Sequence, residues 1–259
     1  MNKQQIILSI LGVVLVLLLF QLPKVVVDNE EEVAAEHDMT VDTEALNRMK
    51  SLREQIETNK NSKISINFAD SLAKEFLHYQ MIDSAARYAE YILNTDSSVE
   101  AKEKAALIYY RSSRIGSVGG NQREYVESAR SLLSVLVENE PDNNSLKNKL
   151  AMTLMASETP MQGVMMLREI VENDPQNREA ILNLGVLAVQ SGQYDRAIER
   201  FENLLELDST DYEATFYKAV SLAESGRSEE GKKFFEEVLN SEDADAATKA
   251  MASNYLKEL

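Results

Sequence analysis

The sequence contains no cysteine and no tryptophan, and it has only two histidines, nine glycines and four prolines. The absence of cysteine excludes disulfides, thiolate nucleophiles and metal sites built on thiolates. The few glycines and prolines leave little room for an architecture rich in β-turns. Basic residues are outnumbered, because 27 lysines and arginines face 43 aspartates and glutamates, which gives a formal net charge of −16. A nucleic-acid partner is therefore not expected, since phosphate binding needs a basic face.

The two histidines do not belong to a catalytic or metal-binding pattern. His37 lies between Glu36 and Asp38, and three adjacent side chains cannot all face one point; His78 is next to Tyr79. No glycine-rich phosphate loop follows a strand in the sequence. We therefore expect no catalytic residues, no metal site, no bound cofactor and no enzymatic activity.

A long apolar run near the amino terminus, Ile6–Leu22, is the first feature with a positive interpretation. Its length is close to the roughly 20 residues that cross a bilayer core. Residues 1–27 are therefore predicted to form a transmembrane anchor, and the acidic residues 28–41 a solvated tether. A cleaved signal peptide is the alternative, but no small-residue cleavage site directly follows the run.

The charges that flank the apolar run predict its orientation. The amino terminus and Lys3 precede it, and Lys24 alone follows it closely. The positive-inside rule then places the amino terminus in the cytoplasm and the rest of the chain outside. In a bacterium this is a single-pass protein of the inner (cytoplasmic) membrane, with its remaining residues in the periplasm.

The segment from 178 to 211 predicts two amphipathic helices joined by a tight turn at Gly192. Small residues, Gly185 and Ala197, stand where the two helices would have to approach closely. Apolar residues recur at three- and four-residue spacing, which is typical of one helix face. The pattern then returns: a shift of 34 residues places Gly231 under Ala197 and Phe235 under Phe201.

A period of 34 residues with helix–turn–helix units resembles the tetratricopeptide repeat (TPR). The resemblance implies an all-α, TPR-type α-solenoid of about five units, with the transmembrane helix at its amino terminus. The predicted boundaries are 42–65 for an amino-terminal capping helix and loop, 66–98, 99–143, 144–177, 178–211 and 212–245 for the units of the array 66–245, and 246–259 for a carboxy-terminal capping helix.

Local signals mark the two ends of the array. Asp42 is the expected N-cap of the capping helix and Asn67 that of the first unit. The stripe that begins at Leu46 is interpreted as packing on the first unit, with self-association as the alternative. The last helix is expected to pack through Ala250, Met251 and Leu256.

In TPR arrays the first helix of each unit lines a concave groove, so the resemblance implies a protein-binding wall here. It is mostly apolar, which suits an apolar peptide or an amphipathic helix. The alternative occupants are the protein's own terminal helix or a second copy of the chain, as a homo-oligomer. The predicted wall residues are Met152, Met155, Leu182, Asn183, Val186, Val189, Phe216, Tyr217 and Val220.

An insertion near residues 114–124 interrupts the second unit and is rich in glycine. Arg111, Arg114 and Arg123 form a local basic cluster there, so this loop is a candidate contact for an acidic partner; a tolerated surface loop is the alternative.

These features predict a non-catalytic, membrane-anchored scaffold or adaptor that binds protein partners, with a role in assembling envelope complexes. The alternative is a holdase-like periplasmic chaperone that binds unfolded client segments through its methionines.

Overall fold

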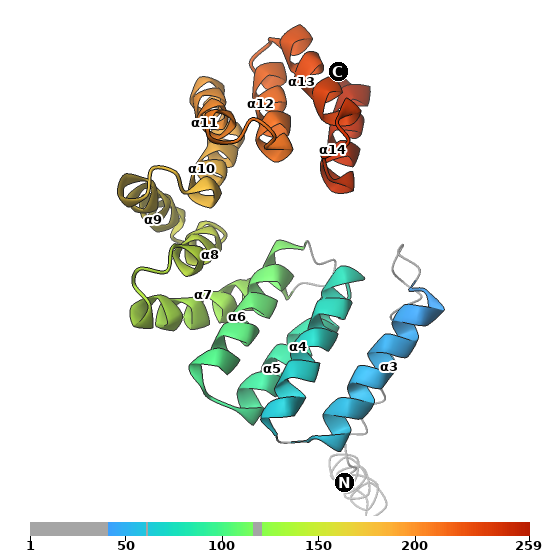
Figure 1. Cartoon of the computed structure of the whole chain (residues 1–259). Helices are drawn as coiled ribbons and strands as arrows, with labels where there is room; N and C mark the ends of the chain where they lie inside the picture. The colour runs from blue at the N-terminus through green and yellow to red at the C-terminus, as the bar shows by residue number, and fades with distance from the viewer. Residues whose placement is uncertain (1–40, 61, 116–120) are drawn as a thin grey trace, which may run out of the picture. The chain divides into compact units, whose positions relative to one another are not determined.

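The computed structural model describes residues 41–60, 62–115 and 121–259. This part of the chain folds into twelve α-helices, without a β-strand among the described residues (Figure 1). The helices are α3 (Thr43–Thr58), α4 (Lys63–His78), α5 (Ile82–Thr95), α6 (Val99–Arg114), α7 (Gln122–Asn139), α8 (Asn144–Met155), α9 (Pro160–Asn173), α10 (Arg178–Gln190), α11 (Tyr194–Leu207), α12 (Tyr212–Glu224), α13 (Ser228–Asn240) and α14 (Ala246–Glu258). The prediction of an all-α, TPR-like helical solenoid is confirmed. The unit boundaries stay predictions.

Neighbouring helices pack in a repeating order. The even-numbered helices from α4 to α12 each contact the odd-numbered helix that follows them, and each also contacts the next even-numbered helix. The even-numbered helices, here called the inner layer, thus form one continuous row. The odd-numbered helices α5, α7, α9, α11 and α13 are here called the outer helices. Each of them contacts the inner-layer helix that precedes it and the one that follows it.

The helix starts follow from residue type. Every inner-layer helix begins after a Ser, Asp or Asn whose side chain accepts a hydrogen bond from a backbone N–H of the first turn, which supplies one of the partners that a helix start lacks. Asp42 caps α3 as predicted. The prediction for Asn67 is wrong, because Ser62 caps α4 and the helix begins at Lys63. A cap at Asn67 would have left a full turn of this helix undetected.

Within a pair, the turn from inner to outer helix uses one recurring geometry. Gly192 and Gly226 have positive φ angles of 70° and 87°. The next residues, Gln193 and Arg227, donate backbone hydrogen bonds of 2.8 and 2.9 Å to carbonyls five residues back. This is the left-handed helix end that glycine adopts without strain. In the first pair the same place is taken by Gln80, with φ 56°.

Small residues let the paired helices approach. A Cβ on Gly185 would lie 2.5 Å from the Phe201 ring, and a Cβ on Gly231 would lie 2.8 Å from the carbonyl oxygen of Ala219. Ala197 is fully buried. The predicted roles of Gly185 and Ala197 as close-packing residues are confirmed. Each pair of helices builds a core on this contact, centred on Phe201 in one and Phe235 in the next.

The terminal helices cover the ends of the inner layer. α3 packs on α4 and buries Met49 and Ile56, while Leu46 stays 46% exposed. α14 packs on α12 and α13. Its predicted contact face was partly wrong, because Ala250 and Met251 are exposed and Ala252 is the fully buried residue. The buried face runs through Thr248 and Ala252, and Leu256 packs against the same core as predicted.

Among the described residues, no helix combines the length and the hydropathy needed to cross a membrane. The predicted anchor, residues 1–27, and all of the predicted tether except Val41 lie outside the described residues. The central glycines of the predicted insertion, within 116–120, lie outside them as well.

Candidate functional site

The predicted binding wall lies on the inner layer, on α8, α10 and α12, but its members are not equally available. Six side chains are half-buried and keep some surface: Met152, Met155, Asn183, Val186, Val189 and Tyr217. The other three are buried, with 8% of Leu182, 6% of Phe216 and 7% of Val220 exposed. Burial therefore divides the predicted wall into a surface and a supporting core.

The burial of Phe216 shows why its position in the repeat did not predict its exposure to a ligand. Its ring lies 5.7 Å from that of Phe235 in the same pair and 6.4 Å from that of Tyr255 on α14. Because α14 packs against α12, a position that would face open space in the middle of an array is covered at its end. We correct the interpretation of Phe216, Val220 and Leu182: in this structure they hold helices together and offer little surface to a ligand.

The half-buried residues lie over the core. Val186, Val189 and Tyr217 pack on the core that contains Phe201, and Tyr217 stacks on that ring at 5.7 Å with an interplanar angle of 20°. Met152 and Met155 pack on the neighbouring core. The result is a row of aliphatic, thioether and aromatic surfaces across three consecutive inner helices.

Charged residues flank this row. Burial raises the pKa of the Tyr217 hydroxyl, nearby Glu213 raises it further, and Arg114 of α6 acts in the opposite direction. Burial also raises the pKa of Tyr110, where Arg114 again opposes the shift and Glu179 of α10 adds to it. Arg114 is thus within electrostatic range of both tyrosines.

The predicted basic cluster is divided by the structure. Arg111 and Arg114 lie in the last turn of α6, whereas Arg123 lies in the first turn of α7. The Arg114 guanidinium lies 5.6 Å from the centre of the Tyr110 ring. Arg123 forms an exposed ion pair of 2.6 Å with Glu158. These three residues therefore have different surroundings, and whether they contact a partner stays a prediction.

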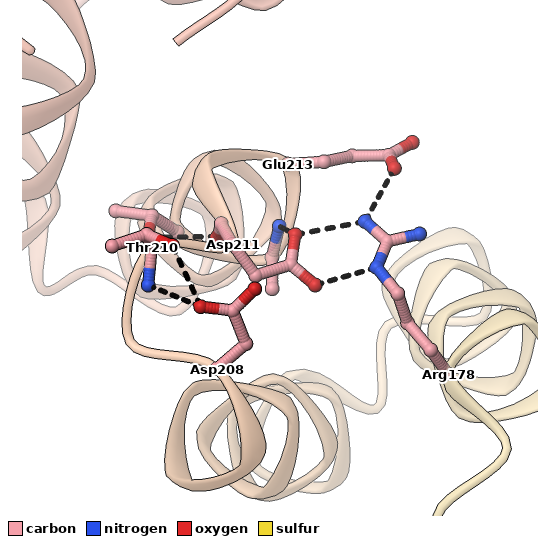
Figure 2. A network of polar contacts seen from close by, with 7 residues as sticks. Arg178, Asp208, Thr210, Asp211 and Glu213 are labelled. Atoms are coloured by element: carbon pink, nitrogen blue, oxygen red, sulfur yellow. Dashed lines mark hydrogen bonds and ion pairs between the residues drawn. The ribbon is translucent and has the colours of Figure 1, made fainter. Parts of the chain in front are cut away.

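A polar network joins α10 to α12 at the start of both helices (Figure 2). Arg178 donates to both carboxylate oxygens of Asp211, at 2.7 and 2.8 Å, and to Glu213 at 2.8 Å. Asp208 accepts from the backbone and hydroxyl of Thr210, and these bonds lower its pKa. Since Arg178 is already paired with two carboxylates, its role here is structural.

Sequence reasoning missed a second surface, on the outer helices. Arg168 of α9 and Arg196 and Arg200 of α11 line a cavity of about 340 Å³. One signal was present in the sequence: Arg196 and Arg200 are four residues apart, so they share a face of α11. What the sequence could not show is that α9 brings Arg168 opposite them.

One histidine, His78, lies in the described region. Its side chain is exposed at the end of α4, and its ring centre lies 4.9 Å from that of Tyr79, with the two rings nearly perpendicular. Within the residues that the structure covers, no three His, Asp or Glu side chains are grouped as a metal site would require. His37 lies outside the described residues.

Comparisons with known proteins agree on the type of fold. Residues 188–254 match the model of the tetratricopeptide repeat family. A tetratricopeptide repeat protein from Parabacteroides merdae superposes with a TM-score of 0.60 at 14% identity, over 83% of this chain and 82% of that one. A comparison with curated proteins gave no match.

Two further solved structures align more loosely. MamA aligns at 18% identity and a TM-score of 0.46, over 67% of this chain and 90% of its own. YrrB, described as a TPR protein with an unusual peptide-binding site, aligns at 20% identity and a TM-score of 0.45, over 82% of this chain and all of its own.

Proposed function

We propose that this protein is a non-catalytic scaffold that binds protein partners on its inner layer. The observation that carries the proposal is the row of half-buried apolar side chains, Met152, Met155, Val186, Val189 and Tyr217, on three consecutive helices. Large contiguous apolar patches on a protein surface mark sites where partners bind. The match to the tetratricopeptide repeat family at residues 188–254 supports the proposal, because it includes α12, one of the three helices that carry this row.

The chemistry of the row favours an apolar peptide or one face of an amphipathic helix. Such a ligand places side chains at three- and four-residue spacing against a groove, and methionine adapts its shape to them. Asn183, half-buried on α10 among these residues, offers a polar group that would fix the register of a bound peptide.

The protein's own last helix is a poor candidate for this place. α14 contacts α12 and α13, its Ala252 is fully buried there, and the hydroxyl of Tyr255 donates to Glu224 of α12. It thereby extends the inner layer. A second copy of the chain remains the alternative occupant, and the binding experiment below separates it from another protein by mass.

The setting that we propose is the inner membrane, with residues 1–27 as an anchor and the repeats in the periplasm. The support is the apolar run Ile6–Leu22 and the positive charge of Lys3 before it. Confinement to a membrane raises the effective concentration of a partner, so a modest affinity of the inner layer suffices for envelope assembly. Activity of a cytoplasm-only reporter fused after Leu259 would reverse this topology.

The experiment that tests the scaffold uses a photo-cross-linking amino acid at Val186 in the full chain in cells. We expect one discrete adduct, identified by mass spectrometry. The matched control is the same amino acid at Leu207, which is 47% exposed on the outer helix α11. Equal labelling from both positions, or none from Val186, would overturn the proposal.

A holdase is the second candidate, favoured by two exposed methionines. Met161 and Met165 on α9 are 64% and 63% exposed, and add flexible apolar surface to Met152 and Met155 of α8. Many weak adducts from Val186 with unrelated proteins support the holdase, whereas one adduct of constant mass supports the scaffold.

A further inference from the structure

An open cavity lies between the outer helices α9 and α11, and three arginines contribute to its lining. Arg168 lies on α9, Arg196 and Arg200 lie on α11, and Leu184 of α10 and Val171 of α9 add an apolar surface. Glu172, Glu199 and Asn203 complete the lining. Its volume of about 340 Å³ is in the lower part of the range of ligand pockets.

These arginines lack acidic partners of their own. In the described part of the chain, neither Arg168 nor Arg200 forms an ion pair, and the Arg196 guanidinium donates at 2.7 Å to the neutral side chain of Gln193. Burial lowers the pKa of Arg200. Repulsion from Arg168 and Arg196 lowers it further, and only Glu199 acts in the opposite direction. Three like charges thus face one another in a protein with an excess of acids.

The next pair of outer helices is the internal control. A shift of one repeat places Glu202 at the position of Arg168, Lys218 at that of Leu184, and Phe234 at that of Arg200. There, Lys218 forms an ion pair of 3.0 Å with Glu202, and its ammonium lies 4.5 Å from the centre of the Phe234 ring. The space between α11 and α13 satisfies its charges internally, whereas the space between α9 and α11 does not.

The local charge selects the kind of ligand. Three arginines and two glutamates leave one net positive charge in the lining, which a monoanion neutralises better than a dianion does. The planar guanidinium matches a carboxylate with two parallel hydrogen bonds. The apolar surface of Val171 and Leu184 accommodates the methylene groups that carry a carboxylate in a peptide.

We propose that the cavity between α9 and α11, lined by Arg168, Arg196 and Arg200, binds a carboxylate of an acidic peptide segment. This site is on the outer helices and is separate from the apolar row of the inner layer, so each can be tested without the other. It would let the protein hold an acidic segment on one side while its inner layer binds a second ligand.

The test is the affinity of the full-length protein for a fluorescent hexaglutamate peptide, measured by anisotropy at low ionic strength. We expect saturable binding that R200Q weakens by about tenfold or more, because Arg200 is half-buried and would lose a partly desolvated charge pair; R168Q should weaken it less, because Arg168 is exposed. The matched control is R130Q, the same change on α7, where Arg130 pairs with Glu127; we expect its affinity to equal that of the wild type.

A gain-of-binding variant removes the ambiguity of a folding defect. E199Q deletes one negative charge from the lining and should tighten hexaglutamate binding severalfold. Acetate should displace the peptide at lower concentration than inorganic phosphate does. The proposal is overturned if R130Q weakens binding as much as R200Q, if E199Q does not tighten it, if phosphate displaces the peptide better than acetate, or if hexaglutamate does not bind.

Discussion

Arg178, the first residue of α10, donates hydrogen bonds to both carboxylate oxygens of Asp211, the N-cap residue of α12. The carboxylate side chain is only 5% exposed, and one of its oxygens also accepts from the backbone N–H of Ala214 at 3.1 Å. One buried carboxylate therefore caps a helix and ties it to the preceding inner-layer helix. These hydrogen bonds to Asp211, together with Glu213, raise the pKa of Arg178, so its charge is retained throughout the accessible pH range.

We predict that R178A lowers the free energy of unfolding by about 1–3 kcal/mol, because it leaves the buried Asp211 carboxylate with its cap bond alone. Urea unfolding followed by circular dichroism measures the change. The control is R227A, which removes an exposed pair with Glu230 and should cost clearly less than R178A does, because solvent screens that pair. Similar losses of unfolding free energy in R178A and R227A would show that the burial of Asp211 does not strengthen its pair with Arg178.

A substitution at Gln80 should raise the stability of the protein. It occupies the left-handed position, φ 56°, that Gly192 and Gly226 take in later pairs. Q80G should relieve the strain of a side chain there and stabilise the protein by roughly 0.5–1 kcal/mol, although glycine also adds entropy to the unfolded chain. Thermal unfolding measures it. G192A, at φ 70° with open space around it, is the reverse change and should destabilise; a lower melting temperature for Q80G would contradict the argument.

The repeat made much of this fold predictable, and the reasons are local. A 34-residue period places Gly185 against Phe201 whatever lies at the ends of the array, because the contact is made within one pair. The burial of Phe216 was not predictable in the same way, since it depends on Tyr255 of α14, which lies outside the repeat. The cavity at Arg200 also depends on side chains from three helices, which no single helix pattern reveals.

The close contact of Gly185 with Phe201 leads to a prediction about packing. G185A introduces a methyl group 2.5 Å from the Phe201 ring, so the ring must move, and we expect a loss of about 1–3 kcal/mol. F201L alone should also destabilise, because it shortens a fully buried side chain. The double variant should lose less than the sum of the two, since the smaller side chain leaves room for the methyl. Additive losses in urea unfolding would contradict this coupling.

Tyr109 gives a prediction at alkaline pH. Its side chain is 6% exposed, and burial raises its pKa to about 12. A free tyrosine titrates near 10, so the unfolded state loses this proton first. The contribution to stability is complete below about pH 10 and is lost as the pH rises toward 12. We expect Y109F to lose less stability than the wild type between about pH 9 and pH 11.5 in urea unfolding. Equal slopes would show that the Tyr109 hydroxyl does not contribute.

Val186 and Phe216 distinguish ligand surface from core on the inner layer. Both were predicted to face a partner, but Val186 is half-buried and Phe216 is 6% exposed beneath α14. V186E should keep the helical content and the unfolding midpoint nearly unchanged while it abolishes the adduct of a cross-linker placed at Val189. F216E should unfold α12 to α14, because a carboxylate in that core has no partner. Amide exchange of α13 separates the two effects. If V186E raises the amide exchange of α13 as much as F216E does, Val186 belongs to the core. If the adduct of the Val189 cross-linker survives in V186E, partners do not bind across this row.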